Sequence, residues 1–426
     1  MSYSLKFTLK SIWRDITIGF RARHLVYPKL ARNEYSAKDL SQYIERQTSR
    51  LGIPRPPNIK ALDTITNNHD CIDKNSLLNN PKKFIKPRSI TTLLRNKIST
   101  SGSTGRPLTL IQDIGTAIRE EAFVYRQLRW AGYTWGDRRA WIRGDIVCSN
   151  TPSNGLYGCR DWWSNTILLS SYHISSSTIK NYIDTLTKFN PVLIQAYPSS
   201  ISTIASWMLA NDIKYTGHSL QAIVTSSETL DPAMQARVEA AFGCRVFDWY
   251  GQAERVTAIG TCEQGNHHAL TDYGGIELLP DADDFYELVG TSYNNQAMRL
   301  VRYKTGDLVK HTKEDCPCGR QFPVVDHITG RRDKTIILSD GRHISRLGHI
   351  FKDAINLIEG QIIYRGNNHI LLRVVPGPKW TTADSEILKT RLKDRVSNIT
   401  VEIETVTTID RGANGKFEFI RIEDCT

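Results

Sequence analysis

The sequence predicts an α/β fold, with a large N-terminal α/β domain over residues 1–330 and a small, mobile α+β C-terminal domain over residues 331–426. Three observations lead to this prediction. Apolar runs alternate with helical periodicity between residues 177 and 250, which is typical of a sheet with helices on its faces. After residue 330 the elements are shorter and form a unit of roughly ninety residues, within the usual domain range. A chain of 426 residues also leaves room for a large buried core.

The expected elements of the large domain follow from apolar spacing and from cap residues. Helices are expected over residues 113–130, 177–189, 201–208 and 231–242, the last with Pro232 at its first position. Buried strands are expected over residues 192–194, 220–225 and 246–250. A turn is expected at residues 197–200, and loops are expected over residues 52–60 and 79–88.

In the small domain, strands and helices are expected to alternate after a boundary near Gly330-Arg331-Arg332-Asp333. The sequence Ser339-Asp340-Gly341-Arg342 predicts a hairpin turn. The other expected elements are strands over residues 335–338, 369–375 and 401–406, and helices over residues 346–357 and 383–396.

The basic residues are concentrated at the start of the chain. The net charge is +11, and residues 1–100 hold 19 Lys and Arg against 7 Asp and Glu, whereas the rest holds 36 against 37. The segment 1–90 is therefore a basic N-terminal segment, for which a solvated surface, coenzyme steering and contact with anionic lipid are the alternatives. Residues Leu5 to Ile18 fit a short basic amphipathic helix. No nucleic-acid-binding module is apparent, so a nucleic acid is not an expected partner.

The eight cysteines fit a reducing compartment better than a disulfide scaffold. Charged residues among the first apolar ones, such as Lys6, Lys10 and Asp15, disfavour a secretory signal. We expect a cytoplasmic protein, a monomer or a dimer. Peripheral contact with the inner face of the membrane, or with a polysaccharide-assembly complex, stays open as an alternative.

A run of hydroxyl and glycine residues, Ser99 to Pro107, predicts a phosphate-binding loop. Glycine lets backbone N–H groups approach an anion, hydroxyls donate hydrogen bonds, and a cation adds charge. The loop lacks the Gly-Lys-Ser/Thr ending of a Walker A motif, and a flexible linker is the alternative reading. The residues expected to bind phosphate are Ser101, Gly102, Ser103, Thr104, Gly105 and Arg106.

Three cysteines and a histidine form a candidate metal site. Cys316 and Cys318 form a C-x-C pair, and Cys262 and His268 lie about fifty residues upstream. Three thiolates and an imidazole suit a tetrahedral structural Zn²⁺ with no open position for catalysis. His267 is a competing ligand, and buried thiols beside an exposed histidine pair are the alternative without metal.

Several further motifs occur in a fixed order along the chain. They are Tyr197-Pro198-Ser199-Ser200, Thr225-Ser226-Ser227-Glu228, Asp248-Trp249-Tyr250-Gly251-Gln252-Ala253-Glu254, Tyr303-Lys304-Thr305-Gly306-Asp307, Gly330-Arg331-Arg332-Asp333 and Gly415-Lys416-Phe417. With these motifs the chain resembles the adenylate-forming (acyl/aryl-CoA synthetase) superfamily over about residues 90–420. Within it, the chain is similar to the phenylacetate–CoA ligase-like branch, which includes ligase-like proteins of capsular polysaccharide biosynthesis. The resemblance also favours His268 as the zinc ligand.

The resemblance implies roles for individual residues. Lys416 and Glu254 are implied as catalytic, Lys416 bridging the acid and the α-phosphate of ATP and Glu254 holding Mg²⁺. Asp333 matches the hinge about which the small domain turns, and Tyr197 is expected in the acid pocket. Residues implied in nucleotide binding, besides the phosphate loop, are Ser227, Glu228, Asp248, Tyr250 (against adenine), Gly251, Asp307 (on the ribose) and Arg331.

The function implied is that of an AMP-forming carboxylate ligase. It would activate a small carboxylic acid with ATP to an acyl-adenylate and pass the acyl group to coenzyme A. No coenzyme A pocket is recognisable in the small domain, so transfer to an amine, giving an amide, is the alternative. A non-catalytic homologue that keeps the nucleotide pocket is the alternative of a different class.

Overall fold

The computed structural model describes residues 2–423 except 54–61, 66–69, 90–92, 100–107, 150–154, 282–283, 312–314, 332–335, 345–346, 352–353, 355, 397 and 413. By internal contacts the chain divides into two compact units. Unit 1 comprises Met1–Thr8, Trp135–Val246 and Arg332–Thr426, and unit 2 comprises Leu9–Thr134 and Phe247–Arg331. The expected division at residues 330 and 331 groups these segments differently and stays a prediction.

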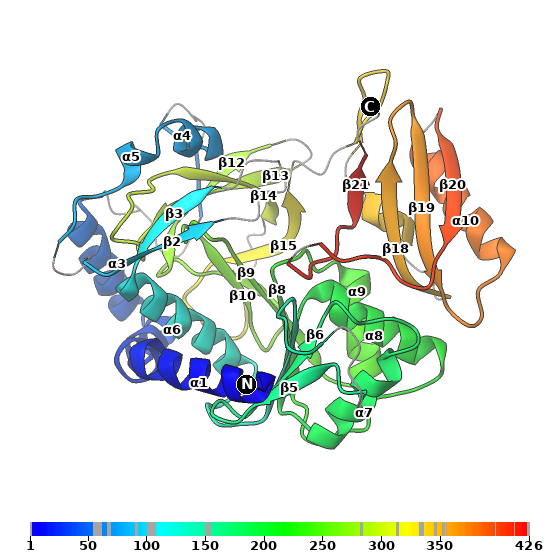
Figure 1. Ribbon diagram of the computed structural model, residues 1–426. Helices are drawn as coiled ribbons and strands as arrows, with labels where there is room; N and C mark the ends of the chain where they lie inside the picture. Colours follow the sequence, from blue (N-terminus) through cyan, green and yellow to red (C-terminus); the bar gives the residue numbers. More distant parts are fainter. Residues whose placement is uncertain are drawn as a thin grey trace. The chain divides into compact units, whose positions relative to one another are not determined.

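The first part of unit 1 is a mainly parallel sheet in the order β8-β7-β4-β6-β5 (Figure 1). Its strands are β4 (Arg139–Arg143), β5 (Gly158–Asp161), β6 (Thr166–Ser170), β7 (Leu193–Ala196) and β8 (Ala222–Ser226). Helices α7 (Ile179–Phe189), α8 (Pro198–Ala210) and α9 (Pro232–Phe242) bury apolar side chains against these strands in one core cluster. The alternation expected from the sequence is confirmed here.

The helix boundaries agree with the cap residues. Asp231 accepts hydrogen bonds from the N–H groups of Ala233 and Met234, so α9 begins at Pro232 as expected. Asp113 caps α6 (Ile114–Trp130) in unit 2 by accepting from Thr116 N. The expected turn at residues 197–200 is instead the first turn of α8, because Pro198 is suited to the first position of a helix.

The second part of unit 1 is a sheet in the order β20-β19-β18-β21, covered by α10 (Thr382–Arg395). Its strands are β18 (Leu357–Tyr364), β19 (His369–Pro376), β20 (Thr400–Thr405) and β21 (Ile420–Ile422). The short strands β16 (Ile336–Ile337) and β17 (His343–Ile344) pair across the expected hairpin turn. Strands β19 and β20 and helix α10 confirm the elements expected there.

The helix expected over residues 346–357 is wrong. A short 3₁₀ helix, η4 (Leu347–Phe351), is followed by strand β18 from Leu357. Pairing explains the difference, because β18 lies between β19 and β21 and is buried along most of its length. A residue that pairs on both edges gains ladder hydrogen bonds that a helical segment there would lose.

Unit 2 contains a mainly antiparallel sheet in the order β1-β12-β13-β14-β15-β11-β10-β9. Its strands are β1 (Asp63–Thr64), β9 (Arg245–Gly251), β10 (Ala258–Thr261), β11 (His267–Ala269), β12 (Gly274–Pro280), β13 (Phe285–Ser292), β14 (Tyr303–His311) and β15 (Val324–Arg331). Separately, β2 (Arg95–Ser99) and β3 (Thr109–Asp113) pair as an antiparallel ribbon. The expected phosphate loop is the connection between β2 and β3.

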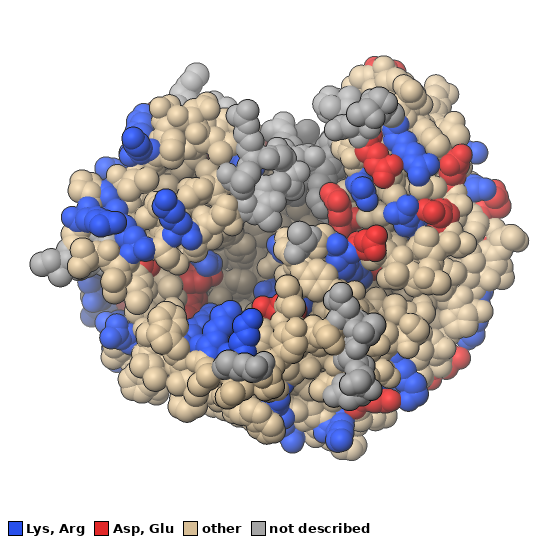
Figure 2. All heavy atoms as spheres, in the orientation of Figure 1, with Lys and Arg blue, Asp and Glu red and all other residues tan. Residues whose placement is uncertain are grey.

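The N-terminal part of the chain is largely helical. Its elements are α1 (Tyr3–Arg14), two π-helical stretches η1 (Asp15–Gly19) and η2 (Ala22–Val26), α2 (Tyr27–Tyr35), α3 (Ala37–Leu51), α4 (Lys74–Asn79) and α5 (Pro81–Phe84). The loop expected over residues 79–88 therefore contains one short helix, α5. In Figure 2, Lys and Arg predominate over Asp and Glu where Figure 1 draws α3 to α6, as the charge count leads us to expect. None of the described helices has the length and apolarity to cross a bilayer.

Candidate functional site

Part of the expected nucleotide site lies outside the described residues. This holds for Ser101, Gly102, Ser103, Thr104, Gly105 and Arg106 of the phosphate loop and for Asp333. Arg331 is the last residue of β15, and its Cα lies opposite that of Asp307 in the ladder between β14 and β15. Two residues implied in nucleotide binding are therefore neighbours in one sheet.

Tyr250 and Asp307 are in direct contact within unit 2. The Tyr250 hydroxyl, on β9, donates to Asp307 Oδ2, on β14, at 2.7 Å. Burial, together with the neighbouring Asp307 carboxylate, raises the pKa of Tyr250 well above its usual value. The phenol is therefore neutral and serves as a donor that fixes the orientation of the carboxylate. A carboxylate held in this way can accept hydrogen bonds from a diol such as a ribose.

Glu254 lies just after β9, in the turn that leads to β10. Its Oε1 accepts a hydrogen bond from the Tyr303 hydroxyl at 3.1 Å, and the residue is half-buried. Asp248, on β9, is fixed by Thr261, whose Oγ1 accepts from Asp248 N at 3.0 Å. Gly251 is the last residue of β9. A half-exposed carboxylate oxygen is a hard ligand of the kind that Mg²⁺ prefers.

Within unit 1, the loop that carries Lys416 packs against residues of the parallel sheet. The Tyr197 hydroxyl donates to Asn414 O at 3.2 Å, and Ser171 Oγ donates to Gly415 O at 3.0 Å. A Cβ added to Gly144 would lie 1.9 Å from Asn414 O, so the two backbones touch. The structure thus brings Tyr197 into contact with the loop of Lys416.

Glu228 links the same loop to the start of α8. Its Oε2 accepts from Ser199 N at 3.0 Å and its Oε1 accepts from Phe417 N at 2.8 Å. Each carboxylate oxygen therefore serves one backbone N–H, and Lys416 directly precedes one of these donors. Three residues that the sequence implied separately, Tyr197, Glu228 and Lys416, meet around this loop. Arg143 lies beside them, with its guanidinium carbon 4.9 Å from the Tyr197 ring centre and Nη2 3.4 Å from Ser227 Oγ.

A buried ion pair holds the loop at its other end. Arg411 Nη2 lies 2.6 Å from Glu359 Oε1, and both side chains are buried. Glu359 Oε1 also accepts from Thr203 Oγ1, on α8, at 2.9 Å. The sequence analysis singled out neither Arg411 nor Glu359 nor Gly144. An ion pair such as Arg411 with Glu359 joins residues far apart in the chain, so no local sequence pattern predicts it. Gly144, directly after β4, was the one sequence feature that could have indicated a close approach of two backbones.

We expect the substitution Glu228→Gln to loosen the Lys416 loop. An amide keeps one acceptor but presents an NH₂ group to the second backbone N–H, and an unsatisfied buried donor costs about 1–3 kcal/mol. Hydrogen exchange at the Phe417 amide should rise about 5- to 150-fold. The control is Glu418→Gln, because the Glu418 side chain is exposed. Unchanged exchange at Phe417 in E228Q would contradict the linkage.

The expected metal ligands converge in unit 2. One ligand atom from each of Cys262, His268, Cys316 and Cys318 lies within 4.8 Å of all the others. The Cys318 Sγ to His268 Nε2 distance is 3.3 Å. The Cys262 and Cys316 sulfurs are 3.6 Å apart, well beyond a disulfide bond. His267 is not in this group, and its Nδ1 lies 3.1 Å from Asp326 O.

The surroundings of the cluster suit metal ligands. Phe322 O lies 2.9 Å from His268 Nδ1, so this nitrogen is the donor and Nε2 faces the sulfurs. Burial lowers the pKa of His268 to about 4, which keeps the imidazole neutral. Asn266 Nδ2 donates to Cys316 Sγ at 3.1 Å, a contact the sequence analysis missed. N–H donors to sulfur favour a thiolate, the form that binds metal.

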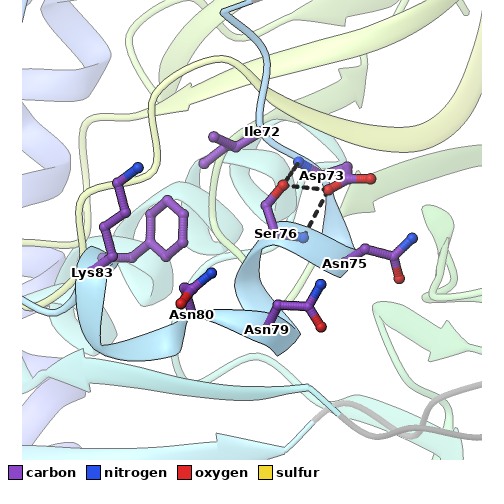
Figure 3. A pocket seen from close by; sticks show the side chains of 8 residues that line it. Ile72, Asp73, Asn75, Ser76, Asn79, Asn80 and Lys83 are labelled. Carbon is purple, nitrogen blue, oxygen red and sulfur yellow. Dashed lines mark hydrogen bonds between the residues drawn. The ribbon is translucent and has the colours of Figure 1, made fainter.

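A cavity of about 490 Å³ opens beside α4 and α5 (Figure 3). Its polar lining includes Asn75, Asn79, Asn80 and Lys83, and none of the residues implied in catalysis or nucleotide binding belongs to it. Asp73 and Ser76 in its wall bind each other in a capping box at the start of α4. The cavity thus offers no group of the expected adenylation chemistry.

Known proteins resemble this chain in sequence. Residues 336–423 match the sequence model of the CapK C-terminal domain. The chain is 26% identical to Protein CapK of Staphylococcus aureus over 243 residues. These residues make up 57% of this chain and 53% of that protein. The chain is 28% identical over 200 residues to phenylacetate-coenzyme A ligase of Thermus thermophilus, 44% of each chain. The chain spans about half the length of the curated relatives it matches.

The fold also has a solved counterpart. A 2-hydroxyisobutyryl-CoA ligase, crystallised in the postadenylation state in complex with R3-HIB-AMP, matches with a TM-score of 0.59. The identity is 16%, and the match covers 93% of this chain and 88% of that one. The expected α/β fold class is therefore confirmed. The fold resembles that of adenylate-forming ligase structures. The expected resemblance is confirmed as well: residues 336–423 match the CapK C-terminal domain model, and the chain is similar in sequence to CapK and to phenylacetate-coenzyme A ligases.

Proposed function

We propose that the chain is an AMP-forming carboxylate ligase, which activates an acid with ATP and transfers the acyl group to coenzyme A. The observation that carries the proposal is the docking of the Lys416 loop on Tyr197 and Glu228. Three hydrogen bonds to backbone atoms beside Lys416, and the buried ion pair of Arg411, fix the loop that carries this lysine. A fixed loop suits a lysine whose ammonium must meet a developing negative charge, because precise placement supplies much of the catalytic effect.

In unit 1, the Lys416 ammonium is proposed to contact both the attacking carboxylate and the α-phosphate. Its positive charge would offset the negative charge that these two groups bring together. Glu228 acts on the backbone next to Lys416, so we assign it a positioning role beside the nucleotide-binding role that the resemblance implies. Tyr197, whose hydroxyl is engaged with Asn414 O, presents its ring as one wall of the acid site. Ser227 is proposed to contact the nucleotide.

In unit 2, Asp307 accepts the ribose hydroxyls, and Tyr250 fixes that carboxylate and offers its ring to adenine. Glu254 would hold Mg²⁺, which when bound would offset phosphate charge. Asp248, Gly251 and Arg331 complete the proposed nucleotide contacts, together with the phosphate-loop residues. The turn of the small domain about Asp333 stays a prediction.

The acceptor is proposed to be coenzyme A, on the homology to phenylacetate-coenzyme A ligases. An amine acceptor is the alternative. A test that separates them incubates the protein with ATP, a panel of aryl and short-chain acids, and either coenzyme A or an amino sugar. Acid-dependent exchange of labelled pyrophosphate into ATP, followed by thioester formation, is the expected result. Exchange followed by amide alone would favour the amine, and ATP binding without exchange for any acid would favour the non-catalytic homologue.

We propose that Cys262, His268, Cys316 and Cys318 hold one structural Zn²⁺. Burial raises the pKa of Cys262 to about 12, so this thiol ionises at neutral pH only beside a cation. The cluster also joins the Cys316–Phe322 loop to strands β10 and β11. Arg320 in that loop contacts Glu34 at 3.3 Å, so the metal would stabilise the packing of α2 as well.

Elemental analysis is expected to give about one zinc per chain. The substitution Cys318→Ser should remove the metal and lower the melting temperature by more than about 5 °C, because structural zinc contributes folding energy. Cys71→Ser is the control, since Cys71 is a half-buried free thiol outside the cluster. Absence of bound metal from freshly purified protein, or equal zinc content in C318S, would contradict the site.

The proposed compartment is the cytoplasm. Each cysteine among the described residues is a free thiol, including the four-ligand cluster. Thiols that must stay reduced to bind metal suit a reducing environment.

A further inference from the structure

The N-terminal helical segment exposes a row of large apolar side chains. Between Tyr3 and Tyr35 the backbone is helical, with two π-helical stretches. Its exposed apolar side chains, with accessible fractions from 49% for Leu9 to 66% for Trp13, are Leu5, Leu9, Trp13, Ile16, Phe20 and Leu25. The first five are spaced by three or four residues, the repeat of one helix face. We call residues 9–32 on this outward side, all within unit 2, the N-terminal helix face.

A different side of this segment is buried from Asp15 onward. Asp15, Gly19, Ala22 and Arg23 are buried, at the three- and four-residue spacing of an inward face. Asp15 and Arg23 form an ion pair of 2.7 Å there. From Asp15 onward the segment therefore has a buried side of its own, and the exposed apolar side chains are additional to it. In α1 no residue is fully buried, and Phe7 is the partly buried residue that packs on a core cluster.

Basic residues accompany the apolar row. Four of the apolar side chains are each followed directly by an exposed cation, in the pairs Leu5-Lys6, Leu9-Lys10, Trp13-Arg14 and Phe20-Arg21. Lys29 and Arg32 continue the exposed basic side. The segment's two acidic residues, Asp15 and Glu34, are both buried and paired with arginines. Arg14 pairs with Glu121 of α6.

Charge complementarity selects the occupant of this face. Residues 3–35 present exposed cations and no exposed carboxylate, so the complement is a surface with diffuse negative charge. A partner protein recognised through so regular a row would need its own acidic groups between apolar ones at each turn. A bilayer with anionic lipid offers both at once, acyl chains for the apolar row and headgroups for the flanking cations.

We propose that the N-terminal helix face docks on an anionic membrane surface. The helix lies in the plane of the interface, with Trp13, Ile16 and Phe20 below the headgroups and the lysines and arginines at the level of the phosphates. The inference does not depend on the proposed ligase activity and adds an interaction surface to it.

The test is co-sedimentation of the full chain with vesicles. One set contains equal parts of phosphatidylglycerol and phosphatidylcholine, and the other contains phosphatidylcholine alone. We expect binding to the anionic vesicles at least tenfold tighter than to the neutral ones, and weaker binding in 0.5 M salt. The triple variant Trp13→Ser, Ile16→Ser, Phe20→Ser should lose at least tenfold in affinity for the anionic vesicles.

The matched control replaces exposed apolar side chains outside this segment, Leu94→Ser, Ile387→Ser and Ile422→Ser, and should bind as the parent does. All six positions are exposed, and circular dichroism and thermal melting check that each variant folds. Equal binding by parent and W13S/I16S/F20S, or no binding to anionic vesicles at low salt, would overturn the proposal. The proposal would also be overturned if the parent formed a dimer without lipid and the same triple variant were a monomer. That result would assign the face to contact with a second copy of the chain.

Discussion

Replacing Lys416 with alanine is expected to lower the rate of acid-dependent pyrophosphate exchange about 10²- to 10³-fold, the usual effect of removing one group that stabilises transition-state charge. The ammonium is proposed to act at the α-phosphate, so its loss should reduce the rate of adenylate formation. ATP binding should change little, because other residues are proposed to hold the adenine and the ribose. The measurement is exchange of labelled pyrophosphate into ATP at saturating acid.

The matched control for K416A is Lys379→Ala. Lys379 lies in the same small sheet domain and pairs with Asp212 at 3.2 Å on an exposed surface. Exposed pairs of this kind contribute little, so K379A should retain activity. If K416A and K379A exchange pyrophosphate at the same rate, Lys416 does not have the role assigned to it.

The substitution Gly144→Ala is expected to lower the same rate about 100-fold without touching a group that reacts. The new Cβ would lie 1.9 Å from Asn414 O and 2.9 Å from Gly415 Cα, and both are backbone atoms. The loop must then shift by an ångström or more, and misplacement on that scale costs about 10²-fold in rate. Hydrogen exchange at the Phe417 amide should rise together with the loss of activity.

The control for G144A lies in the same loop. A Cβ added to Gly412 meets nothing closer than Asn414 Oδ1 at 3.5 Å, which is ordinary contact. Gly412→Ala should therefore keep both activity and amide protection. Full activity in G144A would show that the docked position of the loop is not needed for adenylation.

Much of the α/β core could be predicted from the sequence because its signals are local. Asp113 and Asp231 sit at helix starts, where their carboxylates accept hydrogen bonds from backbone N–H groups, and Pro232 is suited to the first turn. Strands β7 and β8 are short apolar runs between helices. Because these runs are too short for a helix, their length identified them as strands. These signals are readable without knowledge of the tertiary structure.

The segment around β18 could not be predicted in the same way. The apolar residues of positions 346–357 fit helical spacing, but the chain there is a short 3₁₀ turn before a central strand. The neighbours that make β18 a strand, β19 and β21, come later in the sequence. Burial between them outweighs local helix propensity.

The candidate site likewise contains some residues that the sequence could predict and others that depend on the tertiary structure. The ligand set of Cys262, His268, Cys316 and Cys318 could be predicted from residue type, and the choice of His268 over His267 agrees with the observed convergence. The contact of Gly144 with Gly415, and the pairing of Arg411 with Glu359, join positions far apart in the chain. Only the tertiary structure shows that Glu228 accepts two backbone hydrogen bonds beside Lys416.

The central claim is that this chain cleaves ATP between its α- and β-phosphates in order to activate a carboxylic acid. The most direct measurement follows the products of α-³²P-labelled ATP in the presence of the acid panel, with and without coenzyme A. Acid-dependent label in AMP, with acyl-adenylate detected by mass spectrometry when coenzyme A is omitted, is the result expected. Label in ADP, or no acid-dependent product while ATP remains bound, would contradict it.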